Sequence, residues 1–199
     1  MKYMSRKERR VAIVDAAVGL VWEKGLGAAT VRAVAEALQA SPGQIHHHFG
    51  SADELRAEAF REAWRRMTPA LMHDLETLKP LARLAVLIAG PKNEQHVLIQ
   101  RLWRDALASA RMDESVRKAV REELLHWQNV IASALAEANA QGDLSQSLNE
   151  DHAAHRMLAL CLGLDAFDEV VGSDGVNFDR EVIVREAIER EMGFQFEEM

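Results

Sequence analysis

Helical periodicity runs through almost the whole chain, and no other feature restricts the fold as much. Apolar residues recur every three or four positions, as at Val116, Val120, Leu124 and Trp127, which aligns side chains on one face of an α-helix. Strand-like alternation of apolar and polar residues is nearly absent, and only four of the 199 residues are proline. The sequence therefore predicts an all-α fold.

Glycine and proline divide this pattern into separate helices. The first helix is expected to end at Gly25 and Gly27, because glycine readily adopts the conformation that terminates a helix. Two short helices are expected over about 31–38 and 41–48, followed by a longer one over 51–72. Beyond them, we expect helices near 74–89, 94–110, 113–141, 150–171 and 179–191.

Side chains that cap helices mark three of these starts. Thr30 is a typical N-cap residue. Ser41 and Gln44 form an S-x-x-Q capping box with a proline in the first turn, and Ser51 and Glu54 form a second box. Three short helices joined by tight turns and followed by a longer helix are typical of a helix-turn-helix domain.

Four stretches in the first quarter of the chain resemble the TetR family of bacterial transcriptional regulators: A-A-V-G-L-V-W-E-K-G at 16–25, T-V-R-A-V-A-E-A-L at 30–38, S-P-G-Q-I-H-H-H-F at 41–49 and S-A-D-E-L at 51–55. The resemblance implies a homodimer whose N-terminal helices bind a palindromic operator in double-stranded DNA. It implies a DNA-binding domain at 1–50 and a domain at 51–199 that binds a small-molecule effector and dimerises. The helix at 51–72 would link the two.

The partner copy is expected to pair through helices near 150–171 and 179–191. The stretch 153–171 is apolar on nearly every side. A helix of this kind lies at the centre of a core or is shared with a second subunit, and the second option suits a domain of this size.

Candidate DNA-contacting residues lie at the starts of the two short helices and in the basic N-terminal segment. Helix starts attract phosphate, and a glutamine can form two hydrogen bonds with an adenine edge. Capping of a helix is the alternative role for Thr30, Ser41 and Gln44. For Arg32, the alternative is a solvated surface side chain without a DNA contact. The candidates are Arg10, Thr30, Arg32, Ser41, Gln44, His46 and His47.

The consecutive histidines at 46–48 are not expected to bind a metal, because neighbouring helical positions point about 100° apart. We expect no metal and no cofactor. His48 is expected to be half-buried beside Phe49, whereas His46 and His47 are expected to contact DNA. A nearby phosphate favours the protonated imidazole, so DNA binding should tighten as pH falls toward about 6.

Two positions depart from the family pattern. His46 stands where the family usually has tyrosine, and Ala52 stands where it usually has a lysine that contacts phosphate. Residues 1–50 carry seven Lys and Arg against four Asp and Glu, although the whole chain has a net charge of −7. Either the grip on phosphate is weaker here, or the basic residues of the N-terminal segment compensate: Arg6, Lys7, Arg9 and Arg10.

Aromatic and methionine side chains in the body of the chain are candidate effector contacts, because such residues suit apolar or cationic small molecules. An ordinary core position is the alternative for each one. Asp165 and Asp168 are candidates for selecting a cationic effector, and the alternative is that they point to solvent or across a dimer interface. The candidates are Trp64, Met67, Trp103 and Trp127.

Other classes of protein fit the sequence less well. It has no apolar run long enough to cross a membrane, and the single cysteine, Cys161, excludes an internal disulfide; we expect a cytoplasmic protein. It has no nucleophile elbow, phosphate loop or metal-spaced cluster, so we expect no enzyme. The resemblance favours a repressor. The alternative is a helical ligand-binding or protein-interaction module without operator binding.

Overall fold

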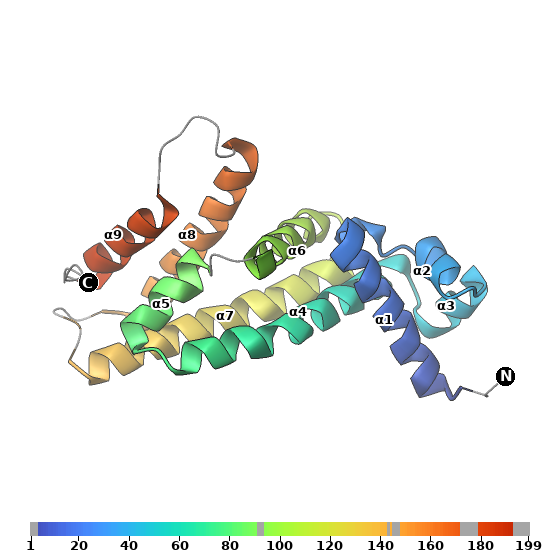
Figure 1. Cartoon of the computed structure of the whole chain (residues 1–199), viewed down its shortest axis with the longest axis horizontal. Coiled ribbons are helices and arrows are strands. Elements are labelled where there is room, and N and C mark those ends of the chain that lie inside the picture. The colour runs from blue at the N-terminus through green and yellow to red at the C-terminus, as the bar shows by residue number, and fades with distance from the viewer. Residues whose placement is uncertain (1–3, 91–93, 143, 145–147, 172–178, 193–199) are drawn as a thin grey trace. The chain divides into compact units, whose positions relative to one another are not determined.

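The computed structural model describes residues 4–90, 94–142, 144, 148–171 and 179–192. Every regular element among these residues is a helix (Figure 1), which confirms the predicted all-α fold. The elements are α1 Arg6–Lys24, the 3₁₀ turn η1 Leu26–Ala28, α2 Val31–Ala37, α3 Pro42–His48, α4 Ala52–Glu76, α5 Pro80–Ala89, α6 Glu94–Ala110, α7 Glu114–Ala140, α8 Glu150–Val171 and α9 Arg180–Met192.

The chain divides into two compact units. Unit 1 comprises Met1–Ala70 and Val97–Glu122, and unit 2 comprises Leu71–His96 and Glu123–Met199. The unit boundaries therefore fall inside α4, α6 and α7. Part of α6 and α7 thus belongs to the same unit as the three N-terminal helices.

In unit 1, α1 contacts α2, and α2 contacts α3. Figure 1 shows these three helices gathered at the N-terminal end of the chain, in shades of blue. Their core contains Ile13, Val18, Val34, Ile45 and Phe49, all with at most 1 % of their surface exposed. Burial of these apolar side chains holds α2 and α3 against α1.

In unit 2, α5, α8 and α9 contact one another. Their core includes Leu84 and Ile88 of α5, Met157 of α8 and Ile188 of α9. No helix among the described residues is both long and apolar enough to cross a membrane.

The helix expected at 74–89 begins later than predicted, because α4 continues through Glu76 and α5 begins at Pro80. Pro80 disfavours helical backbone at the residue before it, and Lys79 is extended, with φ −60° and ψ 153°. Proline is well suited to the first turn of a helix. Pro80 thus starts α5 rather than continuing α4.

The predicted caps have different outcomes. Thr30 caps α2, with its Oγ1 accepting a hydrogen bond from the Ala33 N–H at 3.1 Å. The capping box predicted at Ser41 is wrong: its side chain makes no capping hydrogen bond, because the backbone carbonyl of Ser41 accepts from the Gln44 N–H at 3.0 Å. At the start of α4, Ser51 Oγ accepts from the Glu54 N–H at 3.0 Å.

The second half of the box at Ser51 is displaced by one residue. The Glu54 carboxylate accepts from the N–H of Gly50 at 2.8 Å, not from that of Ser51. A complete capping box that we did not predict begins α1, where Ser5 and Glu8 each accept from the backbone N–H of the other. The S-x-x-E pattern at 5–8 was the available signal.

Candidate DNA-binding surface

The two faces of α3 have opposite environments. Ile45 of α3 is 1 % exposed, and Phe49, the residue directly after α3, is 0 % exposed. Ser41, Gln44, His46 and His47 are exposed. Burial of Ile45 within α3 and of Phe49 at its end anchors the helix and leaves the candidate DNA-contacting side chains at the surface.

The start of α2 also lies at the surface. Thr30 and Arg32 are exposed, while Val34 and Ala35 are buried. The turn between α2 and α3 includes Gln39, which has a positive φ of 50°. The candidates on α2 and α3 therefore belong to two short helices joined by one tight turn.

The three histidines of α3 are not equivalent. His46 and His47 are exposed, and His48 is half-buried as expected. The rings of His47 and His48 meet edge to face, with centroids 5.5 Å apart. Among the described residues, no three His, Cys, Asp or Glu side chains are grouped so that they could hold a metal ion.

Arg10 of α1 is directed at the end of α3. Its Nη1 donates a hydrogen bond to the backbone carbonyl of His48 at 2.6 Å, and its guanidinium carbon lies 4.1 Å from the centroid of the Phe49 ring. A guanidinium in this position combines a charge-assisted hydrogen bond with a cation–π contact. These two contacts position α3 relative to α1.

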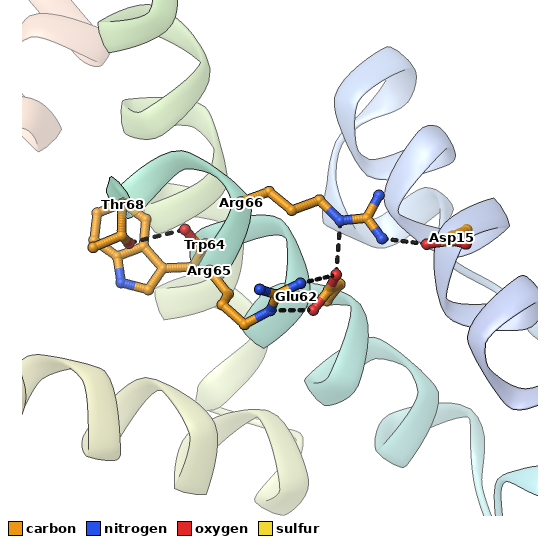
Figure 2. A network of polar contacts seen from close by, with 6 residues as sticks. All are labelled: Asp15, Glu62, Trp64, Arg65, Arg66 and Thr68. Atoms are coloured by element: carbon orange, nitrogen blue, oxygen red, sulfur yellow. Dashed lines mark hydrogen bonds and ion pairs between the residues drawn. The ribbon is translucent and has the colours of Figure 1, made fainter. Parts of the chain in front are cut away.

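A network of charged residues joins α4 to α1 (Figure 2). Arg66 of α4 pairs with Asp15 of α1 and also donates to Glu62 at 2.8 Å. Arg65 donates two hydrogen bonds to Glu62, each at 2.7 Å. These hydrogen bonds, led by those from Arg65, lower the pKa of Glu62 to about 2. Glu62 therefore stays ionised and holds both arginines in place.

Two side chains of α6 hold the C-terminal end of α1 and the turn η1 that follows it, and sequence reasoning missed both. Arg101 donates to the carbonyls of Val21, at 3.3 Å, and Trp22. Asp105 accepts from the N–H of Leu26 at 2.9 Å. We call Arg101 and Asp105 the α6 clasp. The residues that each contacts lie about 80 positions away in sequence, so no local pattern could have indicated them.

Gly25 leaves room for the α6 clasp. It has a φ of +88°, and a Cβ at this position would lie 2.5 Å from the Asp105 carboxylate. Any other residue would strain the backbone and push Asp105 away. The glycine that ends α1 thus also admits the carboxylate of α6.

The candidate effector residues in unit 1 are packed together. Trp103 of α6 meets Trp64 and Phe60 of α4 edge to face, with ring centroids 5.3 Å and 5.4 Å apart. Trp64, Trp103 and Met67 are all at most 8 % exposed. We call Phe60, Trp64 and Trp103 the aromatic cluster. The fourth candidate, Trp127, is also buried but belongs to unit 2.

In unit 2, Asp165 and Asp168 of α8 both pair with Arg180 of α9, at 2.8 Å and 3.0 Å. Arg180 also donates to the carbonyl of Ala89 at the end of α5, at 2.9 Å. Burial, reinforced by the charge of Asp165, raises the pKa of the Cys161 thiol to about 12. The two carboxylates thus join α8 to α9, and Arg180 joins α9 to α5. The raised pKa makes Cys161 an unreactive thiol.

Known proteins match the chain in both its N-terminal and C-terminal parts. Residues 13–59 match the family model for bacterial regulatory proteins of the tetR family. Residues 103–174 match the model for the tetracyclin repressor-like C-terminal domain. The HTH-type transcriptional regulator PksA of Bacillus subtilis is 26 % identical over 183 residues, which cover 90 % of this chain and 87 % of PksA.

Solved structures match over nearly the full length. A Rhodococcus sp. protein described as a TetR-family transcriptional regulator is 26 % identical, with a TM-score of 0.72 over 94 % of this chain and 99 % of that one. A Saccharomonospora viridis transcriptional regulator solved with choline has a TM-score of 0.73 at 21 % identity, covering 94 % and 98 % of the two chains.

The N-terminal match includes α3, which the buried residues Ile45 and Phe49 anchor with its polar side chains exposed. They also account for the helical body that follows the DNA-binding helices. This chain belongs to the TetR family of bacterial transcriptional regulators, and it is a DNA-binding regulator rather than an enzyme.

Proposed function

We propose that this regulator is a homodimeric repressor that binds a palindromic operator and is released by a small-molecule effector. The observation that carries the proposal is the outward side of α3, where Gln44, His46 and His47 are exposed above the buried anchors Ile45 and Phe49. These three side chains are proposed to contact the major groove. Ser41, Thr30, Arg32 and Arg10 are proposed to contact the phosphate backbone or to hold α2 and α3 against it.

The proposed mechanism of release is geometric. A dimer of this class must present its paired helices about 34 Å apart, or at a multiple of that distance, to reach two half-sites on one face of the duplex. An effector that favours a different separation weakens DNA binding, and DNA weakens effector binding by the same free energy.

The α6 clasp supports a route for this change within unit 1. Arg101 and Asp105 hold the end of α1 and the turn that follows it, and Arg10 of α1 holds the end of α3. A shift of α6 would therefore displace α1, and α1 would carry α3 with it. The domain assignment that goes with this route is DNA binding by residues 1–50 and effector binding and dimerisation by 51–199.

Exposed apolar residues on α8 and α9 support the proposed dimer. Val170 and Phe167 of α8 are 84 % and 45 % exposed, and Val182 of α9 is 37 % exposed. Exposed apolar side chains gathered on two neighbouring helices are typical of a protein–protein contact. A substitution of Val170→Glu should shift the chain from dimer to monomer in analytical ultracentrifugation, whereas the exposed α7 control Asn129→Ala should leave the dimer intact.

The effector is proposed to be a small apolar or cationic molecule. Trp64, Met67 and Trp103 of unit 1 and Trp127 of unit 2 are the candidate contacts, and aromatic rings suit a quaternary ammonium group. The choline bound by the Saccharomonospora viridis regulator makes choline a reasonable first compound to test. A rise in the melting temperature with choline, absent with glycerol, would support this class.

Selection of bound sites from random DNA tests the proposed function. A palindrome recovered by the wild-type protein, and lost by a Gln44→Ala/His47→Ala variant with an unchanged melting temperature, would support paired α3 helices. The exposed α7 variant Asn129→Ala is the matched control. Failure to enrich any sequence would favour the alternative of an interaction module without operator binding.

A further inference from the structure

An open groove of about 440 Å³ separates the N-terminal end of α1 from the exposed edge of α3. A second groove, of about 470 Å³, shares Arg6 and His48 with it and is also lined by Lys7 and Arg10. The charged, amide and imidazole side chains that line the first groove are those of Arg6, Arg9, Gln44, His47 and His48, and Ser5 and Ser41 add two hydroxyl groups.

The groove is strongly cationic. Arg6, Arg9 and Arg10 of α1 and His47 of α3 are the charged or titratable groups that act on the His48 ring, and Lys7 lines the adjoining groove. The nearby carboxylate of Glu8 is occupied by its hydrogen bond from the Ser5 N–H at 2.7 Å. Within the described part of the chain, neither Arg6 nor Arg9 pairs with a carboxylate. The groove therefore offers an anion several positive charges.

In the absence of such an anion, the surroundings of His48 disfavour its protonated form. Partial burial of the ring, followed by the positive charges of His47, Arg6, Arg10 and Arg9, lowers its pKa from the ordinary 6.5. An anion in the groove would offset those charges and make protonation of the ring easier.

We propose that this groove binds a phosphate group of the DNA backbone, and that His48 takes up a proton from solvent as the phosphate binds. The inference rests on the proposed function, because the phosphate is that of the operator. The protonated ring gains a second N–H donor and a positive charge. The side chains that touch the phosphate are those of Arg6, Arg9 and His48.

Arg10 has a different role in this site. Its guanidinium is engaged with the His48 carbonyl and the Phe49 ring, so it is a positioning residue that keeps His48 at the groove. The arginines of α1 thereby compensate for Ala52, which stands where the family usually has lysine.

A mixed-sequence fluorescent duplex is a sufficient probe, because a backbone contact does not depend on base sequence. We expect wild-type binding, measured by anisotropy at constant ionic strength, to be up to about tenfold tighter near pH 6 than near pH 8, the effect of a one-unit rise in pKa. His48→Gln should abolish this dependence, whereas the control His73→Gln, an exposed histidine of α4 that belongs to unit 2, should retain it. Equal pH dependence in His48→Gln and wild type would overturn the proposal.

The arginines are tested through the salt dependence of binding. Arg6→Gln/Arg9→Gln should reduce the slope of log K against log salt by about one, the value for one phosphate contact. Arg121→Gln, at an exposed position of α7, serves as the control for loss of a cation away from α1, α2 and α3, because its salt slope and pH dependence should remain those of wild type. An unchanged slope in the double variant would overturn the role of the α1 arginines.

An NMR titration of the wild-type protein keeps the test independent of variant folding. The pKa of the His48 imidazole should rise when the duplex is added, and inorganic phosphate alone should not produce this rise at the same phosphate concentration. A full rise with inorganic phosphate would instead identify a free-anion site and overturn the assignment to DNA. A protein that binds no duplex overturns the proposed function as well, whereas binding without a change at His48 overturns only this inference.

Discussion

The exposed residues of α3 and two tryptophans of the aromatic cluster, Trp64 and Trp103, are both predicted to bind a partner, yet the structure gives them opposite environments. Gln44, His46 and His47 on α3 face solvent. Trp64 and Trp103 pack against each other and are 4 % and 7 % exposed. One set is positioned to meet a partner without moving, whereas the other already has apolar partners inside the protein.

This difference reflects what each kind of site requires. A DNA-binding helix needs an apolar face that anchors it and a polar face that is exposed, and both follow from local helical spacing. An effector site needs a cavity, which depends on side chains from helices far apart in sequence. Sequence patterns therefore indicate the first kind of site more directly than the second.

The largest expected effect is on the free energy of unfolding, which should distinguish the buried tryptophans from the exposed residues of α3. Trp103→Ala should lower the free energy of unfolding by about 3–5 kcal/mol, because it leaves a cavity and removes the contacts with Phe60 and Trp64. His47→Ala should change it by less than about 0.5 kcal/mol, since the side chain is exposed. Urea denaturation measures both. A small loss for Trp103→Ala together with altered effector binding would mean that Trp103 lines a site rather than fills a core.

DNA recognition gives the next largest effect. Gln44→Ala should weaken binding to a selected operator by about 1–3 kcal/mol at one base position, because the hydrogen bonds to a base edge are lost. Binding to mixed-sequence DNA should change much less. Isothermal titration with both duplexes provides the comparison. Equal losses on the two duplexes would show that Gln44 contacts the backbone instead.

A pH-dependent effect is expected in the network that joins α4 to α1. The pKa of Glu62 is lowered to about 2, so its contribution to stability is present above the ordinary carboxyl pKa and is lost as pH falls toward 2. After allowance for solvent screening, Glu62→Gln should cost about 1 kcal/mol at neutral pH. Denaturant unfolding should show the two proteins converging in acid. A constant difference from neutral to acid pH would contradict the ion pairs with Arg65 and Arg66.

The smallest expected effects are at Thr30 and Ser41, the residues that directly precede α2 and α3. Thr30→Ala should cost about 0.5–1 kcal/mol, because it removes the acceptor for the Ala33 N–H. Ser41→Ala should cost only a few tenths of a kcal/mol, since its side chain makes no capping hydrogen bond. Chemical denaturation of the two variants in parallel is sufficient. A larger loss for Ser41→Ala would restore the predicted capping box.

Several parts of the fold followed from local sequence. The end of α1 at Lys24, the Thr30 cap and the outward side of α3 depend on residues within a few positions of one another. Two local predictions were wrong: the capping box at Ser41 and the start of the helix predicted at 74–89. The N–H of Gln44 donates to the backbone carbonyl of Ser41 and not to its side chain. The helix predicted from residue 74 begins instead at Pro80.

The remaining features required three-dimensional contacts. In the sequence, Arg10 is one of several basic residues near the N-terminus. Its cation–π contact with the Phe49 ring is evident only in the structure. The α6 clasp joins residues about 80 positions apart. The pairing of Asp165 and Asp168 with Arg180 likewise depends on how α8 meets α9. Charge and spacing in the sequence could not indicate these partners.

Hydroxyl-radical footprinting on a selected operator tests the central claim most directly. Paired α3 helices predict two symmetric protected regions on one face of the duplex, with centres about 34 Å apart or at a multiple of that distance. The Gln44→Ala/His47→Ala variant should lose both regions together. A single protected region, or two regions without symmetry, would contradict the account.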